Sequence, residues 1–310
     1  MEVLVVNAGS TSLKLHLVCG NESRPVDDFV EADAVGHRVV HGGSRFVGPT
    51  VVDDDVEAAI EELAVLAPLH NRRALEEIRR AREAVPSVPH VAVFDTAFHR
   101  TMPPAASTYA VPQRWRDEWG VHRYGFHGIS VQWVTSQVDA ERLVVCHLGG
   151  GCSVTAVRDG HSVDTTMGFS PLEGVPMATR SGSVDPGALL YLLREGLLKE
   201  DELEQALEHE SGLAGLSRGG SGDAREASPL ALDVFVHRVA AAIASMAAAC
   251  GGIDVLAFTG GIGEHADEIR RRIVERVLFL GDFHVAVVAS REELVIAAET
   301  RGVLEGRLTS

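Results

Sequence analysis

VLVVNAGSTSLKLHLV (residues 3–18) joins two apolar runs through a short polar turn. Apolar β-formers on both sides of a glycine and hydroxyl turn predict a strand, a tight reversal and a second strand. The pattern returns half a chain later in LVVCHLGGGCSVTAV (residues 143–157). An offset of 141 residues places Ala8–Leu13 over Gly149–Val154 and Ser12 over Ser153. Two related hairpins indicate two duplicated halves, and chance similarity of two hairpins is the alternative.

The rest of the chain alternates between helical and strand-like patterns. Further strands are expected at 90–94 and 254–258, and a glycine-rich turn at 259–264 precedes a helix from His265 to about Arg276. This alternation predicts two packed α/β domains with a cleft between them. Apolar periodicity predicts the other helices over 53–66, 71–85, 186–198, 230–250 and 291–305.

Length, net charge and cysteine spacing argue against several classes of function. A length of 310 residues suits two domains, and a net charge of −16 argues against a nucleic-acid partner. The four cysteines lack metal-ligand or CxxC spacing, which indicates reduced thiols in a cytoplasmic protein without a visible signal peptide. The longest apolar run, Val239–Ile253, is too short for a membrane span and predicts a buried helix, so no membrane association is expected.

Three glycine-rich turns follow apolar strands, at 7–12, 149–153 and 259–264. Glycine lets backbone N–H groups approach a phosphate closely, so the three turns together favour phosphate binding. None of them matches a P-loop or a GxGxxG motif, so a nucleotide site would be of another kind.

Charged residues cluster near other glycines and strand ends. Arg38 lies in a strand-like run that ends in two glycines, and Asp95 ends an apolar strand, where α/β proteins collect ligand-binding residues. Lys14, His127 and Arg180 also lie close to glycines. A surface lysine and a structural histidine are the ordinary alternatives for Lys14 and His127.

Seven segments resemble the motifs of the acetate kinase family, in that family's order and over nearly the whole chain. They are NAGSTSLK (7–14), GHRVVHGG (36–43), APLHN (67–71), FDTAFH (94–99), YGFHG (124–128), MGFSPLEG (167–174) and FTGGIGE (258–264). The resemblance implies an α/β fold of two duplicated ribonuclease-H-like domains, as in actin, sugar kinases and heat-shock ATPases. Residues 1–99 plus 294–310 would form the first domain, and residues 100–293 the second, which would carry most of the nucleotide site.

The resemblance also implies a reversible phosphoryl transfer between ATP and acetate, with Mg²⁺ (or Mn²⁺) as the metal. Arg38 and Arg180 would bind the carboxylate and the transferring phosphoryl group, and His127 and Arg180 would stabilise the transition state. Asn7, Asp95 and Glu292 would organise the metal and its waters, with Asp95 counted among the catalytic residues. Arg38, Val40, Leu69 and Pro171 would form the pocket for the acid. The phosphate and nucleotide residues would be Ser10, Ser12, Lys14, His147, Gly149, Gly150, Gly151, Asp223, Arg225, Gly261, Ile262, Gly263 and Glu264.

An electrostatic site of this kind predicts a simple mutational result. Arg38→Ala or Arg180→Ala should lose at least ~100-fold in turnover while folding normally, since removing one such donor costs about 2.7–4 kcal/mol of barrier.

The sequence departs from the family mainly on the nucleotide side. Gly150, Ala224, His265 and Arg291 stand where the family usually has other residues, and Val131 replaces a histidine near the catalytic loop. Propionate or butyrate kinase, and a different phosphoryl donor such as pyrophosphate, therefore stay open as alternatives. A non-catalytic nucleotide-dependent regulator on the same fold is a more remote one. The expected partners are a small carboxylate, a nucleotide and a second copy of the chain in a homodimer.

Overall fold

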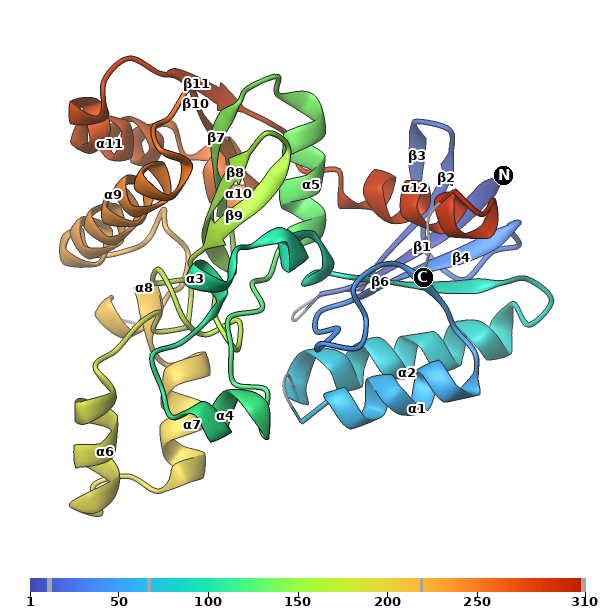
Figure 1. The fold of residues 1–310 in the computed structure, drawn as a ribbon, viewed down its shortest axis with the longest axis horizontal. Helices are drawn as coiled ribbons and strands as arrows, with labels where there is room; N and C mark the ends of the chain where they lie inside the picture. Colours follow the sequence, from blue (N-terminus) through green and yellow to red (C-terminus); the bar gives the residue numbers. More distant parts are fainter. Residues whose placement is uncertain (10–12, 66–67, 218–219, 308–310) are drawn as a thin grey trace. The chain divides into compact units, whose positions relative to one another are not determined.

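The computed structural model describes residues 1–9, 13–65, 68–217 and 220–307, without the side chains of residues 68 and 69. The chain divides into two compact units, each with its own sheet (Figure 1). Unit 1 comprises Met1–Thr101, Ala110–Ser136 and Ser290–Ser310, and unit 2 comprises Met102–Tyr109 and Gln137–Ala289. The domain boundaries expected from the sequence stay a prediction.

The sheet of unit 1 has the strand order β3-β2-β1-β4-β6-β5. β1, β4 and β6 run parallel, and β2, β3 and β5 are antiparallel to their neighbours. The strands are β1 (Glu2–Ala8), β2 (Leu13–Cys19), β3 (Glu22–Val26), β4 (Ala34–Val39), β5 (Thr50–Val51) and β6 (His90–Phe94).

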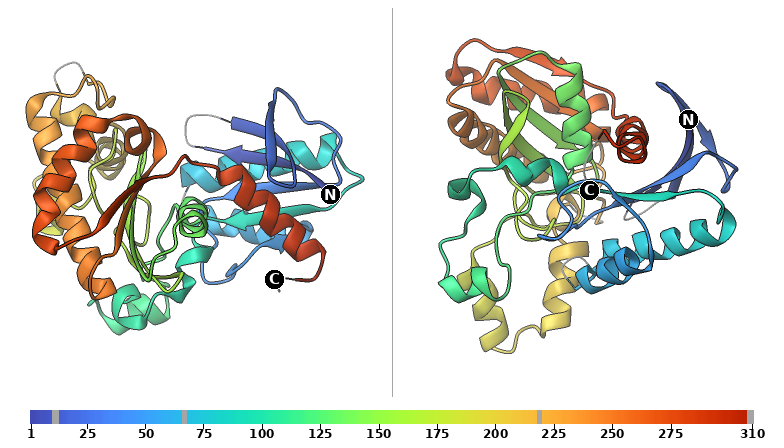
Figure 2. Two further views of the ribbon diagram at one scale, coloured as in Figure 1. Left: turned by 90° about the horizontal axis from the view of Figure 1, so that it is seen from above. Right: turned by 45° about the vertical axis from the view of Figure 1, so that its right-hand side comes forward.

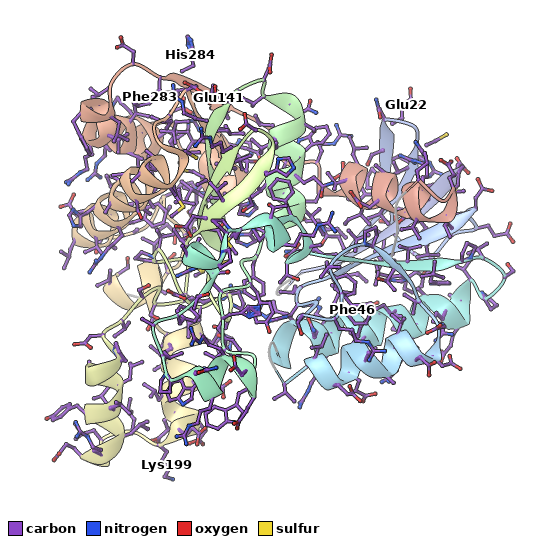
Figure 3. The ribbon with its side chains drawn as sticks, in the orientation of Figure 1. Glu22, Phe46, Glu141, Lys199, Phe283 and His284 are labelled. Atoms are coloured by element: carbon purple, nitrogen blue, oxygen red, sulfur yellow. The ribbon has the colours of Figure 1, made fainter. Side chains whose placement is uncertain are left out.

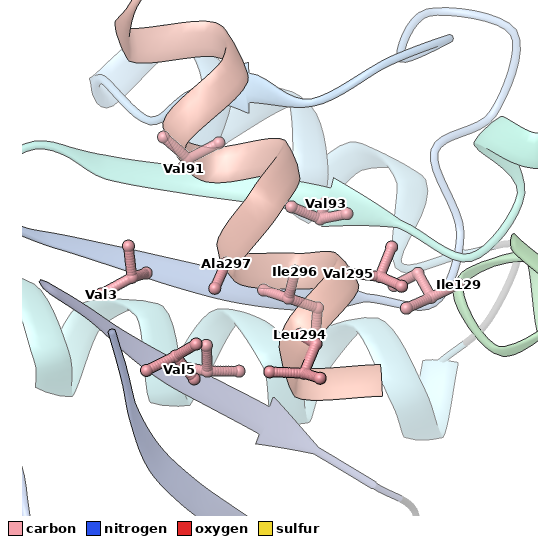
Figure 4. Close-up of a cluster of buried hydrophobic side chains, with 10 residues drawn as sticks. Val3, Val5, Val91, Val93, Ile129, Leu294, Val295, Ile296 and Ala297 are labelled. Carbon is pink, nitrogen blue, oxygen red and sulfur yellow. The ribbon is translucent and has the colours of Figure 1, made fainter. Parts of the chain in front are cut away.

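Helices cover both faces of this sheet because its strands alternate apolar side chains above and below. Val3 and Val5 face α12 (Glu292–Leu304), which crosses the sheet in Figures 2 and 4. Leu4 and Val6 face the other side, where α2 (Pro68–Ala84) packs beside α1 (Asp54–Leu63). Buried strands of this kind, apolar on both faces, are typical of a parallel sheet inside an α/β layer structure.

A glycine allows α12 to lie close to β4. A Cβ atom on Gly36 would stand 2.5 Å from Thr300 Oγ1 and 2.9 Å from Ile296 Cγ2. The C-terminal helix therefore completes unit 1, and Gly36 of the GHRVVHGG segment is needed for packing. The remaining helices of this unit are η1 (Ala97–Thr101), α4 (Gln113–Asp117) and α5 (Gly128–Gln137), whose last residue belongs to unit 2.

The sheet of unit 2 repeats the strand order of unit 1. Its order is β11-β10-β7-β8-β9, with β7, β10 and β11 parallel and β8 and β9 antiparallel to their neighbours. Thus β7, β8, β9, β10 and β11 correspond to β1, β2, β3, β4 and β6, which supports the duplication expected from the two hairpins. The strands are β7 (Arg142–Leu148), β8 (Cys152–Arg158), β9 (His161–Thr165), β10 (Val255–Thr259) and β11 (His284–Val287).

The predicted constant offset of 141 residues between the two hairpins is wrong, because it does not match the strand pairing in the structure. Asn7 pairs with Lys14 in the first hairpin, and His147 pairs with Ser153 in the second, each one pair before the strand ends. Lys14, and not Ser12, therefore corresponds to Ser153. The reason is that the connection between the paired strands is one residue shorter in the second hairpin.

One long helix packs on the sheet of unit 2. α9 (Pro229–Cys250) packs on β7, β8 and β9 and against α11 (Asp267–Val277). It has 22 residues and is apolar enough to cross a membrane by length and composition, but its Phe235, Val239 and Ile243 side chains are buried inside the protein. The other helices are α3 (Pro104–Ser107), α6 (Pro186–Arg194), α7 (Glu200–His209), α8 (Gly212–Leu216), α10 (Gly260–His265) and η2 (Leu278–Leu280).

The glycine-rich segment after β10 is helical, which differs from the expected open turn. α10 begins at Gly260 and ends at His265, and a separate helix, α11, follows after Ala266. Gly260 has a φ angle of +78°, so it makes the sharp bend from strand to helix that a residue with a side chain would adopt only under strain.

Candidate active site

Three predicted residues lie at the carboxyl ends of the parallel strands of unit 1. Asn7 is on β1, Arg38 is on β4, and Asp95 directly follows β6. β4 aligns Arg38 with Val93 of β6, and β1 aligns Val6 with His37, which brings Asn7 level with Arg38. The register of the sheet thus collects these three side chains at the edge where ligands bind in α/β proteins.

Arg38 and Asp95 form a two-point ion pair. Nε of Arg38 lies 3.1 and 3.2 Å from the two Asp95 oxygens, and Nη2 donates to Asp95 Oδ2 at 2.6 Å. Nη1 donates to Asn7 Oδ1 at 3.2 Å. Three of the five guanidinium N–H groups are therefore held within the described residues, which leaves one N–H on each terminal nitrogen.

The charges of this cluster keep Arg38 cationic although its side chain is only 13% exposed. Burial by itself would lower the pKa of Arg38, but the nearby carboxylates of Asp95 and Glu292 raise it above its ordinary value. Asp95 is 2% exposed, and burial raises its pKa while Arg38 opposes that effect. A partly buried arginine fixed in this way has the geometry of a preorganised anion-binding group.

Glu292, in the first turn of α12, joins the same cluster. Asn7 Nδ2 donates to Glu292 Oε2 at 2.9 Å, and Arg38 Nη1 lies 3.9 Å from that oxygen. Asn7, Lys14 and Glu292 also line a pocket of about 690 Å³ within unit 1. The predicted metal residues Asn7 and Glu292 are therefore neighbours, and Lys14 shares their pocket.

His127 is positioned by a tight turn against Asp95. It adopts a left-handed backbone with φ of +60°, which is uncommon for a residue with a side chain. Its backbone N–H bonds the Asp95 carboxylate, and Gly128 N donates to the Asp95 carbonyl at 2.9 Å. A Cβ on Gly128 would lie 2.1 Å from that carbonyl oxygen, so glycine is required there. Backbone strain at such a position is a common feature of functional sites.

Other motif residues hold the GHRVVHGG loop in place. Asn71 accepts from His41 N at 3.0 Å and donates to the His41 carbonyl at 2.9 Å. Thr96 Oγ1 accepts from Gly42 N at 3.1 Å. The structure therefore gives Asn71 and Thr96 a positioning role that the sequence did not specify.

For the other predicted residues of unit 1, the structure describes the position only in part. Val40 is buried directly after β4 and two residues from Arg38. Leu69 lies in the first turn of α2, but its side chain is outside the described residues, as are Ser10 and Ser12. Among the described residues, no group of three or more His, Cys, Asp or Glu side chains is placed to hold a metal.

Unit 2 contains Arg180 and the MGFSPLEG segment. Arg180 Nη1 donates to the Pro171 carbonyl at 3.3 Å, and Arg180 Nε lies 3.3 Å from Glu208 Oε2. The Pro171 segment is itself held by Tyr109, whose hydroxyl donates to Glu173 and accepts from Phe169 N at 3.0 Å. The structure thus brings Arg180 and Pro171 together within one unit.

The predicted nucleotide residues of unit 2 meet at the carboxyl end of its parallel strands. His147 aligns with Thr259 at the ends of β7 and β10, and a Cβ on Gly149 would lie 3.7 Å from Gly261 N. Gly150 and Gly261 have open space around them, where a Cβ would meet nothing within 4 Å. Both glycine segments, Gly149–Gly151 and Gly261–Glu264, therefore lie at one edge with room for a ligand.

Two charged residues of this set are engaged with the protein itself. Glu264 Oε1 accepts from Gly260 N at 3.1 Å and so braces the start of α10. Arg225 donates through Nε to both oxygens of Asp223, at 2.9 and 3.1 Å, and this side-chain hydrogen bonding lowers the pKa of Asp223 to about 2. Asp223 orients Arg225, which is 85% exposed.

Sequence reasoning did not single out Tyr109, Glu173 and Glu208 as residues of the site. Glu173 lies inside the MGFSPLEG segment (167–174), and this motif could have indicated it. Tyr109 and Glu208 lie in no motif, and Glu208 belongs to the acidic helix EDELEQALEH (200–209), where nothing distinguishes it from its neighbours.

The duplicated strand order, with the predicted site residues at the carboxyl edge of each sheet, defines a ribonuclease-H-like α/β protein of the actin and sugar-kinase class. Comparison with known proteins agrees with this class. The structure superposes on a propionate kinase from Francisella tularensis subsp. tularensis SCHU S4 with a TM-score of 0.90 and 33% identity, covering 97% of this chain and 99% of that one. An acetate kinase from Porphyromonas gingivalis gives a TM-score of 0.85 and 31% identity, covering 98% and 99% of the two chains.

Sequence comparison identifies the family. The model of the acetokinase family matches residues 21–300. An acetate kinase of Protochlamydia amoebophila (strain UWE25) is 48% identical over 271 residues, which is 83% of this chain and 68% of the length of that protein. The chain belongs to the acetokinase family. The predicted family and fold class are confirmed.

Proposed function

We propose that the chain is an acetate kinase, which transfers a phosphoryl group reversibly between ATP and acetate to give acetyl phosphate and ADP. The observation that carries this proposal is the partly buried Arg38, fixed by Asp95 and Asn7 with one N–H on each terminal nitrogen left for a ligand. That arrangement fits the planar, two-oxygen end of a small carboxylate. Family membership supplies the reaction class.

The chemistry asks for charge cancellation and positioning, because acetate is already ionised at neutral pH and needs no general base. The transferred phosphoryl group is anionic as well, so two negative groups must be brought together in line. Arg38 would bind the carboxylate, and Arg180 and His127 would bind the phosphoryl oxygens. Arginine suits both tasks since it stays charged and donates through a rigid fork.

The residues around Glu292 fit a magnesium ion that is held mainly by phosphate oxygens and water. Asn7 already bonds Arg38 and Glu292 through both ends of its amide, and Glu292, with a side chain 14% exposed, is the carboxylate of this cluster proposed to face the ion. Mg²⁺ commonly uses one or two carboxylates and keeps several waters. When bound, the ion would neutralise charge on the phosphate chain, and Mn²⁺ would suit the same oxygen ligands.

ATP is proposed to bind at the glycine edge of unit 2. Gly150 and Gly261 leave open space, and backbone N–H groups near them could approach phosphate closely. His147, Asp223 and Arg225 would lie on the nucleotide side, and Ser10, Ser12 and Lys14 would line the phosphate path of unit 1. Pyrophosphate is retained as a candidate donor because Gly150, Ala224, His265 and Arg291 differ from the family's usual residues.

Propionate is the second candidate acid, and the similarity to the Francisella tularensis propionate kinase favours it. Val40, Leu69 and Pro171 would form the wall that sets the size of the alkyl group. Butyrate would need a wider pocket of the same kind.

We also propose a cytoplasmic homodimer. α6 has no buried residue, and Leu190, Tyr191 and Leu197 are between 53% and 57% exposed on it and just after it. Such a run of exposed apolar side chains fits a surface covered by a second copy. Leu190→Glu should lower the oligomeric mass measured by light scattering, and an unchanged mass would exclude this face.

Trapping of acyl phosphate with hydroxylamine tests the function directly. Acetate, propionate and butyrate are each combined with ATP, GTP and pyrophosphate in the presence of Mg²⁺. The proposal expects the highest rate with acetate and ATP. If no pair gives a product, the chain is not a carboxylate kinase, and the nucleotide-dependent regulator becomes the better reading.

A further inference from the structure

The loop that carries Arg180 is attached to the C-terminal end of α7. Thr179 Oγ1 donates to the Glu208 carbonyl at 2.9 Å, and Ser181 N donates to the Leu207 carbonyl at 3.0 Å. Ser211 N returns a bond to the Thr179 carbonyl at 2.9 Å. α6 precedes α7 in the chain, and Lys199, the residue before α7, marks their connection in Figure 3. The backbone on both sides of Arg180 is therefore held by one helix end.

The same helix end also contacts the guanidinium. Arg180 Nε lies 3.3 Å from Glu208 Oε2, with the two side chains 12% and 18% exposed. On its other edge, Nη1 donates to the Pro171 carbonyl at 3.3 Å and lies 3.8 Å from Met177 Sδ. The guanidinium is thus held at Nε by a carboxylate and at Nη1 by a carbonyl oxygen.

We propose that Glu208 is the positioning residue of Arg180, and this rests on the proposed role of Arg180 in phosphoryl transfer. An arginine side chain has several rotatable bonds, and a partly buried carboxylate restricts them before substrate arrives. Glu208 does for Arg180 what Asp95 does for Arg38, although it comes from a helix and not from a strand end. It acts through Arg180 and does not touch the substrates.

A set of five variants tests this role. Glu208→Ala removes the carboxylate, Glu208→Gln keeps its shape and one acceptor oxygen, and Arg180→Ala and the double variant Arg180→Ala/Glu208→Ala complete a cycle. Glu204→Gln is the matched control, because Glu204 is exposed one turn earlier on α7 and forms no ion pair with the described residues. Turnover, KM and the urea midpoint of unfolding are measured for each.

Glu208→Ala should lower turnover about 10-fold or more, as expected when a catalytic group is misplaced, and Glu208→Gln should fall between it and wild type. Glu204→Gln should keep wild-type turnover. In the Arg180→Ala background, Glu208→Ala should cause no further loss, because residues that act as a unit are not additive. A purely structural role would lower turnover in both backgrounds.

Wild-type turnover in Glu208→Gln and Glu208→Ala, or an equal loss in both backgrounds, overturns the positioning role while leaving the proposed function intact. If Glu208→Ala unfolds, the isosteric Glu208→Gln decides the question by turnover at an unchanged midpoint. A wild-type protein that makes no acyl phosphate from any pair refutes the proposed function instead.

Discussion

The two sheets share five strands in one order, but their carboxyl edges are built differently. In unit 1 the edge carries Asn7, Arg38 and Asp95, which form a partly buried charged network. At the corresponding edge of unit 2, β7 ends with His147 and Leu148 and β10 ends with Thr259, followed by the glycines at 149–151 and 260–261. One scaffold therefore presents charged side chains in one copy and open backbone in the other.

The difference fits the proposed function, in which the two copies bind different substrates. A preorganised arginine binds a small carboxylate by its geometry, and exposed backbone with glycine binds a phosphate chain by close approach. In the proposed function each copy of the sheet offers its edge to a different ligand, and the residues at the strand ends decide which ligand an edge suits.

The largest effects are expected at Arg38. Arg38→Ala should lower turnover at least ~100-fold. It should also destabilise unit 1 by about 3–5 kcal/mol, since it leaves Asp95 buried without its partner. Normal folding, as expected from the sequence, is therefore no longer expected for this variant. Activity and urea unfolding measure the two effects.

Asp95→Asn in the Arg38→Ala background separates folding from catalysis. The double variant should recover most of the lost stability, because the unpaired charge is gone, and should stay inactive. If Arg38→Ala alone is as stable as wild type, the ion pair between Arg38 and Asp95 does not stabilise unit 1.

A methyl group at Gly36 tests the packing of α12 on β4. Gly36→Ala would place Cβ 2.5 Å from Thr300 Oγ1 and 2.9 Å from Ile296 Cγ2, so it should destabilise unit 1 by about 1–3 kcal/mol. Thr300→Ala in the same chain should return part of this loss. Chemical unfolding measures both, and an unchanged midpoint for Gly36→Ala would contradict the close approach.

Acid should weaken unit 1 before unit 2. Burial lowers the pKa of His99 to about 4, although its bond to the Phe126 carbonyl opposes this, whereas no described histidine of unit 2 is buried. His99 binds a proton near pH 6.5 in the unfolded chain but only near pH 4 in the folded chain. The stability that neutral His99 contributes above pH 6.5 is therefore lost as the pH falls towards 4. His99 alone should cost about 2 kcal/mol between pH 7 and pH 5.

The tryptophans make this comparison measurable. All three lie between residues 115 and 133, in unit 1, so their fluorescence reports that unit while far-ultraviolet circular dichroism reports both. At pH 5 the fluorescence transition should precede the dichroism transition in urea. His99→Gln should lose about 2 kcal/mol less on acidification than wild type, and an identical pH dependence would exclude His99 as the cause.

The smallest change in stability is expected at Gly261. Gly261→Ala meets open space, so its free energy of unfolding should stay within about 0.5 kcal/mol of wild type. The added methyl group would occupy space proposed for the nucleotide, so KM for ATP should rise several-fold. A normal KM for ATP would remove this edge from the proposed nucleotide site.

Much of the fold could be predicted from the sequence, because buried strands such as His90–Phe94 read as uninterrupted apolar runs. The hairpin register could not, since a connection one residue shorter in the second copy shifts the pairing of Lys14 and Ser153. The helical start at Gly260 was missed because glycine is a poor helix former and favours turns.

The motifs predict which residues belong to the candidate site, but the contacts between those residues depend on the fold and could not be predicted. The motifs predict Arg38 and Asp95 separately, and their ion pair follows from the parallel register of β4 and β6. Glu208 had no sequence signal, because an acidic helix offers many equivalent carboxylates. Only the attachment of the Arg180 loop to the end of α7 distinguishes it.

The central claim is that Arg38 binds the carboxylate of an acid that this protein phosphorylates. The most direct test compares wild type with Arg38→Ala/Asp95→Asn in hydroxylamine trapping with acetate, ATP and Mg²⁺. We predict hydroxamate formation by wild type and a rate at least ~100-fold lower in the folded double variant. Equal rates in the two proteins, or no product from wild type with any acid and donor, would contradict the claim.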